Sequence, residues 1–195
     1  MIDRRGAWAH AAPALCLIAA ACASIEPPPT SSLPVDSAAL TAPFNAEGRL
    51  SARRGNDGFS GHFEWTHDGA RDAIVLSTPL GQTVARLDGD ATGARAELSD
   101  GRIEQAADWE ALTTEALGMA LPVRGLSGWL RGLPRSDSPH TVERDARARP
   151  VLLRQDGWEI VFGYEGADAP RASRLTLRYA SAEPIEVRIV GDRWQ

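Results

Sequence analysis

The residues of this chain that could carry out chemistry are histidines, serines and carboxylates. His62 and His67 lie five positions apart, so their side chains would point to opposite faces of a strand, and both are expected at polar positions. His140 stands apart from both. The sequence has no G-x-S-x-G elbow, no H-E-x-x-H metal-binding run and no phosphate-binding glycine loop. We therefore predict no enzyme, no metal site and no cofactor.

The N-terminus has the pattern of an export signal. Over residues 1–21, Asp3-Arg4-Arg5 precedes an apolar segment that is too short to span a bilayer and ends in small residues. The end of this segment, Ala19-Ala20-Ala21-Cys22, resembles the bacterial lipoprotein signal, in which the cysteine is lipidated and becomes the first residue of the mature protein. The alternative is a soluble secreted protein that is cut after Ala21.

Lipidation of Cys22 would fix the protein on a membrane. Three acyl chains, each with more than a dozen methylenes, bind almost permanently at about 0.8 kcal/mol per buried CH₂. Ala23 follows the cysteine, and the absence of aspartate there permits transfer to the outer membrane. Cys16 would be removed with the signal, so the folded part would have no disulfide and no thiolate site.

Composition separates a tether from a domain. Residues 22–43 are rich in proline and serine, and from Glu26 to Pro43 this composition predicts an extended tether. Residues 44–195 have the length of one domain with one core. The formal net charge of the chain is −5, it contains no lysine, and its arginines are dispersed, which excludes a nucleic-acid footprint. We expect a monomer.

Alternation of apolar and polar residues dominates this domain. Phe59, Phe63 and Trp65 fall on one face of a strand, with polar residues between them. Ten or eleven such strands are joined by short turns, including Asp100-Gly101 and Asp156-Gly157, which favours one antiparallel sheet. A twisted sheet of this length would curl into an open or partly closed barrel.

Two short helices interrupt the strands after the sixth one. Asp108 is a candidate N-cap for a helix that ends at Gly118. After Pro122, a second helix would place Leu126, Trp129, Leu130 and Leu133 on one stripe. These apolar stripes must be buried, and the concave face of the sheet is the expected partner.

The segment Ser77-Thr78-Pro79-Leu80-Gly81-Gln82 joins two predicted strands. Pro79 presets φ for a turn and Gly81 tolerates positive φ, which leaves a large apolar residue, Leu80, between them. Two interpretations remain open. Leu80 could fold back to cap the core, or a stiff loop could hold it out towards a membrane or an acyl chain.

Several motifs, in order along residues 44–195, resemble the LolB family of outer-membrane lipoproteins. They are Gly48-Arg49-Leu50, Phe63-Glu64-Trp65, Thr78-Pro79-Leu80-Gly81, Leu117-Gly118 with Leu121-Pro122, Leu126 to Pro134, Gln155-Asp156-Gly157-Trp158, and Trp194. The resemblance implies an unclosed antiparallel β-barrel with a short-helix lid over an apolar cavity for lipoprotein acyl chains. It also implies a periplasmic LolA-like carrier as partner, insertion of the cargo into the outer membrane, and a role for the loop Pro79, Leu80 and Gly81 in that insertion.

The residues expected to line this cavity are apolar and face inward, although ordinary core packing would give the same pattern. Arg49, in one of the motifs, could hold a backbone carbonyl or a carboxylate. A structural outer-membrane lipoprotein that serves as a protein–protein adaptor, with a solid core, is the alternative function. The expected cavity residues are Phe63, Trp65, Leu76, Trp109, Leu112, Leu126, Trp129, Leu130, Ile160 and Phe162.

Overall fold

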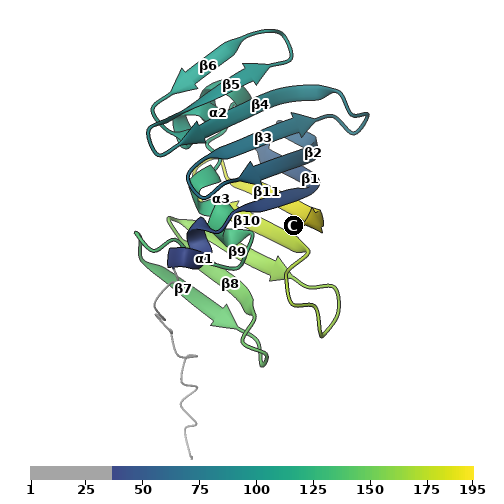
Figure 1. Cartoon of the computed structure of the whole chain (residues 1–195), viewed down its shortest axis with the longest axis vertical. Helices are drawn as coiled ribbons and strands as arrows, with labels where there is room; N and C mark the ends of the chain where they lie inside the picture. Colours follow the sequence, from purple (N-terminus) through teal and green to yellow (C-terminus); the bar gives the residue numbers. More distant parts are fainter. Residues whose placement is uncertain (1–36) are drawn as a thin grey trace, which may run out of the picture.

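The alternating residues form one antiparallel sheet. A computed structural model describes residues 37–195, and its eleven strands are hydrogen-bonded in the order β6-β5-β4-β3-β2-β1-β11-β10-β9-β8-β7 (Figure 1). Because β6 and β7 remain edges, the sheet does not close, which confirms the predicted unclosed barrel. The strands are β1 (Phe44–Arg54), β2 (Asp57–His67), β3 (Asp72–Ser77), β4 (Thr83–Asp90), β5 (Gly93–Leu98), β6 (Ile103–Ala106), β7 (His140–Arg144), β8 (Pro150–Gln155), β9 (Trp158–Gly163), β10 (Arg174–Tyr179) and β11 (Ile185–Trp194).

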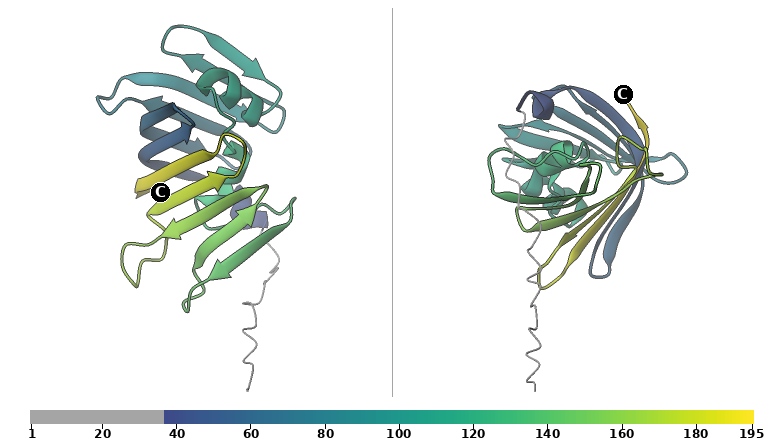
Figure 2. Two further views of the ribbon diagram at one scale, coloured as in Figure 1. Left: turned by 180° about the vertical axis from the view of Figure 1, so that it is seen from behind. Right: turned by 90° about the horizontal axis from the view of Figure 1, so that it is seen from below.

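The sheet bends sharply around its apolar face (Figure 2, right). The pairing of β1 with β11 shifts register between Glu47 and Gly48, and such bulges increase bend and twist. Gly48 lies opposite Phe63 on β2, and a Cβ on this glycine would stand 3.0 Å from Cε1 of Phe63. The missing side chain therefore lets the strands fold closely at the bend.

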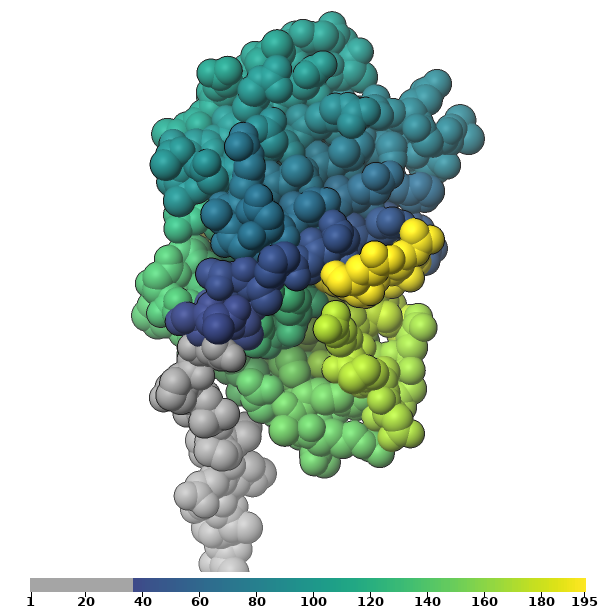
Figure 3. Space-filling model, in the orientation of Figure 1, coloured from purple at the N-terminus to yellow at the C-terminus, as the bar shows by residue number. Residues whose placement is uncertain are grey.

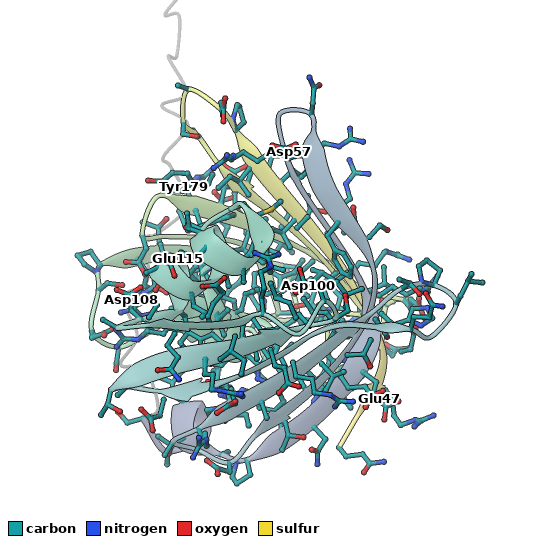
Figure 4. All side chains as sticks on the ribbon, turned by 90° about the horizontal axis from the view of Figure 1, so that it is seen from above. Glu47, Asp57, Asp100, Asp108, Glu115 and Tyr179 are labelled. Carbon is teal, nitrogen blue, oxygen red and sulfur yellow. The ribbon has the colours of Figure 1, made fainter. Side chains whose placement is uncertain are left out.

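Two helices lie on the concave side of the sheet (Figure 2, right), and Figure 4 marks Asp108 at the start of α2 and Glu115 within it. In α2 (Trp109–Leu117), Oδ1 of Asp108 accepts a hydrogen bond from the Ala111 N–H at 2.8 Å, and Gly118 ends the helix with φ of 75°. The prediction for this helix is confirmed. Helix α3 (Val123–Trp129) ends before Leu133, so the predicted stripe continues past the helix and Leu133 is only half-buried.

The segment that was expected to be an extended tether is partly helical. Helix α1 (Ser37–Thr41) lies directly before β1, so the prediction of extended chain is wrong for residues 37–41. The reason is tertiary: the Arg131 side chain donates hydrogen bonds to three backbone carbonyls of residues 39–42. The predicted export signal and Cys22 lie outside the described residues.

Candidate functional site

A small apolar cavity lies between the sheet and the helices. Its volume is about 40 Å³, and every lining residue is apolar except Thr113, whose hydroxyl is engaged by the Leu121 N–H at 2.8 Å. We call residues 109–130, which comprise α2, α3 and their connection, the lid. The sheet side is lined by Leu50, Phe63, Trp65, Ile74, Leu76, Leu87 and Ile189, and the lid side by Thr113, Leu117, Leu121, Val123, Leu126 and Leu130.

The structure brings together half of the residues that were expected to line a cavity. Phe63, Trp65, Leu76, Leu126 and Leu130 line it. Alternation could have found three further sheet residues, because Ile74, Leu87 and Ile189 share the inward face of their strands. The other five expected residues, Trp109, Leu112, Trp129, Ile160 and Phe162, are buried in the core but do not line this cavity.

The lid is closed in this structure. An apolar cavity of about 150 Å³ can hold a molecule the size of benzene, and the space present here is far smaller. The lid side chains occupy the volume that an acyl chain would need. Space for a chain therefore requires Leu126, Leu130 and their neighbours to move away from the sheet.

A buried glutamine fixes the C-terminal end of the lid. Oε1 of Gln155, on β8, accepts hydrogen bonds from Trp129 Nε1 and from the Arg135 N–H, both at 2.8 Å. Its Nε2 donates to the Arg135 carbonyl at 2.9 Å and to the Ser138 hydroxyl at 2.8 Å. The Arg135 guanidinium in turn hydrogen-bonds Asp137 and holds the pKa of that carboxyl below its ordinary value. Every polar atom of the Gln155 amide is thus paired.

A second buried polar group supports the cavity wall. Oδ1 of Asp72 accepts a hydrogen bond from Trp65 Nε1 at 2.7 Å and lies 2.8 Å from His67 Nδ1. His67 is buried and stacks on Phe44 with ring centroids 5.1 Å apart. His67 was expected at a polar position of its strand, but the inward, buried face of β2 continues to this residue, and Asp72 supplies its partner. His62 is exposed, on the opposite face.

The loop between β3 and β4 holds its leucine away from the protein. The Gly81 N–H donates to the Thr78 carbonyl at 2.9 Å, and Gly81 has φ of 83°, as the turn residues predicted. Leu80 is 90% exposed, which excludes the interpretation that it caps the core. In Figure 1 this loop projects on the right, whereas α1 lies on the left. The right view of Figure 2 also shows the loop and α1 far apart.

Other surface features carry less functional signal. Nη2 of Arg49 pairs with Asp192 at 3.2 Å on the outer face, where both side chains are largely exposed. A wider groove of about 840 Å³ lies at the β8–β9 and β10–β11 turns, beside the start of β7, and its lining includes Trp158, Arg154 and Arg178. This groove is open to solvent, and charged residues of both signs stand among its lining residues.

Within residues 37–195, no three histidine, cysteine or carboxylate side chains are grouped to hold a metal ion. In the same range, no helix has the length and apolar character required to cross a bilayer.

Comparison with known proteins identifies the family. The family model described as "Outer membrane lipoprotein LolB" matches residues 42–194. The chain belongs to the LolB family. An outer-membrane lipoprotein LolB from Thiobacillus denitrificans is 37% identical over 89% of this chain and 90% of its own length. The LolB of Chromobacterium violaceum is 35% identical over 93% of this chain and 95% of its own length. Membership confirms the predicted family, the outer-membrane location and the role in lipoprotein localisation.

Solved structures show the fold alone. A DUF1329 family protein from Desulfovibrio piger superposes with a TM-score of 0.51 at 8% identity, covering 82% of this chain and 89% of its own. A LolA superfamily protein from Nitrosomonas europaea gives a TM-score of 0.46 at 8% identity, covering 80% and 86%. The first of these two likenesses, to the DUF1329 family protein, shows that a similar fold occurs outside the LolB family.

Proposed function

We propose that this LolB-family chain receives lipoproteins by taking their acyl chains between the lid and the sheet, and then releases them into the outer membrane. A LolA-like carrier in the periplasm supplies the cargo, and no reaction is catalysed. The observation that carries the proposal is the apolar seam between the sheet and the lid, in which twelve of thirteen lining residues are apolar.

The energetics favour an exchange of side chains for acyl chain. A chain of about a dozen methylenes gains roughly 10 kcal/mol on leaving water, at about 0.8 kcal/mol per CH₂. Moving the five apolar lid residues off the sheet costs about 1.5–3 kcal/mol for each residue that becomes exposed. For one acyl chain the two quantities are similar, so the lid side chains can exchange with one chain of the cargo at little net cost. A receptor balanced in this way can also release its cargo, which a tight binder could not do.

The exposed Leu80 provides a membrane contact for the release step. Burying one leucine contributes only about 2 kcal/mol, too little to hold the domain on a bilayer. Because Cys22 is expected to carry the permanent anchor, Leu80 acts on the rate by entering the headgroup layer near the cargo.

The tether can place this loop on the membrane even though α1 lies on the other side of the domain. The 15 residues from Cys22 to Ser37 span at most roughly 50 Å when extended. A domain of about 150 residues has a diameter of about 40 Å. The anchor therefore permits the domain to turn Leu80 towards the bilayer.

A second candidate is a structural outer-membrane adaptor. The observation in its favour is the small cavity volume, about 40 Å³, which is also what a solid core would show. The two candidates differ in whether the lid moves away from the sheet so that an acyl chain can bind between them.

Titration with a fluorescent fatty acid tests the proposal. The protein carrying Cys22→Ala, which cannot be lipidated, is expected to bind one or more fatty-acid molecules with micromolar affinity. Displacement by an unlabelled lipopeptide would exclude binding through the dye. Absence of saturable binding would favour the adaptor.

A further inference from the structure

We infer that Arg131 latches the membrane tether to the lid, so that docking of α1 keeps the acyl cavity closed and undocking of α1 frees the lid. The purpose of this latch rests on the proposed function, but the latch itself is a physical coupling that can be measured separately. Arg131 directly follows Leu130, which lines the cavity.

The guanidinium of Arg131 binds the end of α1. Nη1 donates to the carbonyls of Ala39 at 2.6 Å and Ala42 at 3.0 Å, and Nη2 donates to Leu40 at 2.6 Å. Nε donates to the Ser127 carbonyl within the lid at 2.9 Å. One side chain therefore joins the last turn of α3 to the carbonyl end of the tether helix.

Helix α1 depends on this docking. Five residues are far fewer than the roughly 12–15 that an isolated helix needs to be marginally stable in water. None of its residues is fully buried, so packing alone gives it little support. Helix α1 is therefore stable only while its contacts with the rest of the domain are present, and loss of those contacts is expected to unfold it.

The docked helix lies where lid and sheet meet. Cδ2 of Leu40 is 3.0 Å from the position of a Cβ on Gly128, so this leucine packs directly on α3. The Thr41 carbonyl lies against Gly69 in the turn between β2 and β3. In Figure 3 the purple residues at the start of the described chain lie at the surface beside the green residues that follow the lid. Helix α1 therefore bridges the lid and the sheet.

The guanidinium is also held from the sheet side. Its central carbon lies 4.9 Å from the ring centroid of Phe44, the first residue of β1. Burial lowers the pKa of Arg131 from its ordinary value, and the Asp72 carboxylate acts in the opposite direction. Arginine stays charged at physiological pH, so release of α1 would leave a half-buried cation with fewer partners. The cost of leaving the guanidinium with fewer partners favours the state in which α1 is docked.

The lid end is thus attached at two points. Trp129 is bonded to Gln155 on β8, and Arg131 is bonded to α1. Movement of Leu130 away from the sheet must strain or break the second attachment, since the two residues are adjacent. A change at the tether can therefore alter lid opening without any contact to the acyl chain.

Hydrogen exchange on the full-length protein in phospholipid vesicles tests the latch. Arg131→Gln and, separately, Leu40→Asp are expected to speed exchange of residues 123–130 about tenfold, while exchange in β1 and β2 stays unchanged. The double variant should exchange no faster than either single variant, because both changes release the same contact. Arg124→Gln is the matched control, since this α3 arginine is about half exposed and makes a long ion pair of 3.9 Å with Asp137.

The outcomes separate a latch from a general effect on stability. Unchanged lid exchange in Leu40→Asp would overturn the inference, as would additive effects in the double variant. Faster exchange in β1 and β2 as well would assign the contacts to overall stability and would also overturn it. The assay uses no acyl ligand, so a failure of fatty-acid binding refutes the proposed function and leaves this result standing.

Discussion

The indole N–H of Trp129 donates to Oε1 of Gln155 at 2.8 Å, and both residues are almost completely buried. Trp129 is the last residue of α3, and Gln155 is the last residue of β8. Removing one member of a buried hydrogen-bonded pair destabilises the protein, because the remaining donor or acceptor stays buried without a partner and its desolvation cost is no longer offset. The pair therefore sets where the lid ends.

Replacing Gln155 by leucine should destabilise the protein. The change leaves Trp129 Nε1 and the Arg135 N–H without an acceptor, and each unpaired buried donor costs about 1–3 kcal/mol. We expect the free energy of unfolding to fall by roughly 2–4 kcal/mol in urea titrations. Gln105→Leu on the exposed face of β6 is the control and should change little. Equal losses in the two variants would refute a special role for the Gln155 network.

Leu126→Ala should change stability and ligand affinity in opposite directions. Truncating a buried leucine typically costs about 2–5 kcal/mol of stability. The same change removes a side chain that competes with hydrocarbon for the cavity, so the fluorescent fatty acid should bind several-fold more tightly. Leu177→Ala, buried but away from the cavity, should lose stability without tighter binding. Weaker binding in Leu126→Ala would contradict exchange between the lid and the cargo.

Leu80→Glu should slow the release of cargo while fatty-acid binding stays unchanged. A carboxylate at a site that is 90% exposed costs the fold little but opposes entry into a membrane. The measurement is the rate of lipoprotein transfer from carrier to vesicles. Ile103→Glu is a matched control, because Ile103 is another exposed large apolar residue, on edge strand β6. If both variants transfer at the wild-type rate, the loop has no part in insertion.

Stability should fall in acid below about pH 4. The Arg149 guanidinium, 2.7 Å from Oδ2 of Asp145, lowers the pKa of that carboxyl, and Arg135 does the same to Asp137. A lowered folded pKa gives stability that is present above the unfolded value of about 3.9 and is lost as pH falls through the folded value. Urea midpoints at pH 7, 5, 3 and 2 measure this, and Asp145→Asn should flatten the acid limb. An unchanged slope in that variant would contradict the assignment.

Local rules predicted most of the fold. Alternation located the strands, Asp108 and Gly118 fixed the ends of α2, and the residues Pro79 and Gly81 gave the turn that holds Leu80 out. These features depend on neighbours in sequence, so the sequence is enough to find them.

Long-range contacts account for what was missed. Helix α1 exists because of Arg131, about ninety residues away, which composition of the tether cannot indicate. His67 can be buried because its Nδ1 is hydrogen-bonded to Oδ1 of Asp72 across the β2–β3 turn. Inward residues such as Ile160 and Leu76 look alike in the sequence, and only the position of the lid decides which of them faces the cavity.

Tryptophan quenching by a brominated fatty acid tests the central claim most directly, because bromine quenches only an indole close to it. Trp65 lines the cavity under the lid, whereas Trp158 lines the open groove between the strand ends. The account predicts saturable quenching in the wild-type protein that is reduced in Trp65→Phe, with the indoles of Trp109 and Trp129 in the lid supplying the remainder, and that is unchanged in Trp158→Phe. Quenching that survives in Trp65→Phe and disappears in Trp158→Phe, or no quenching in any of the three proteins, would contradict it.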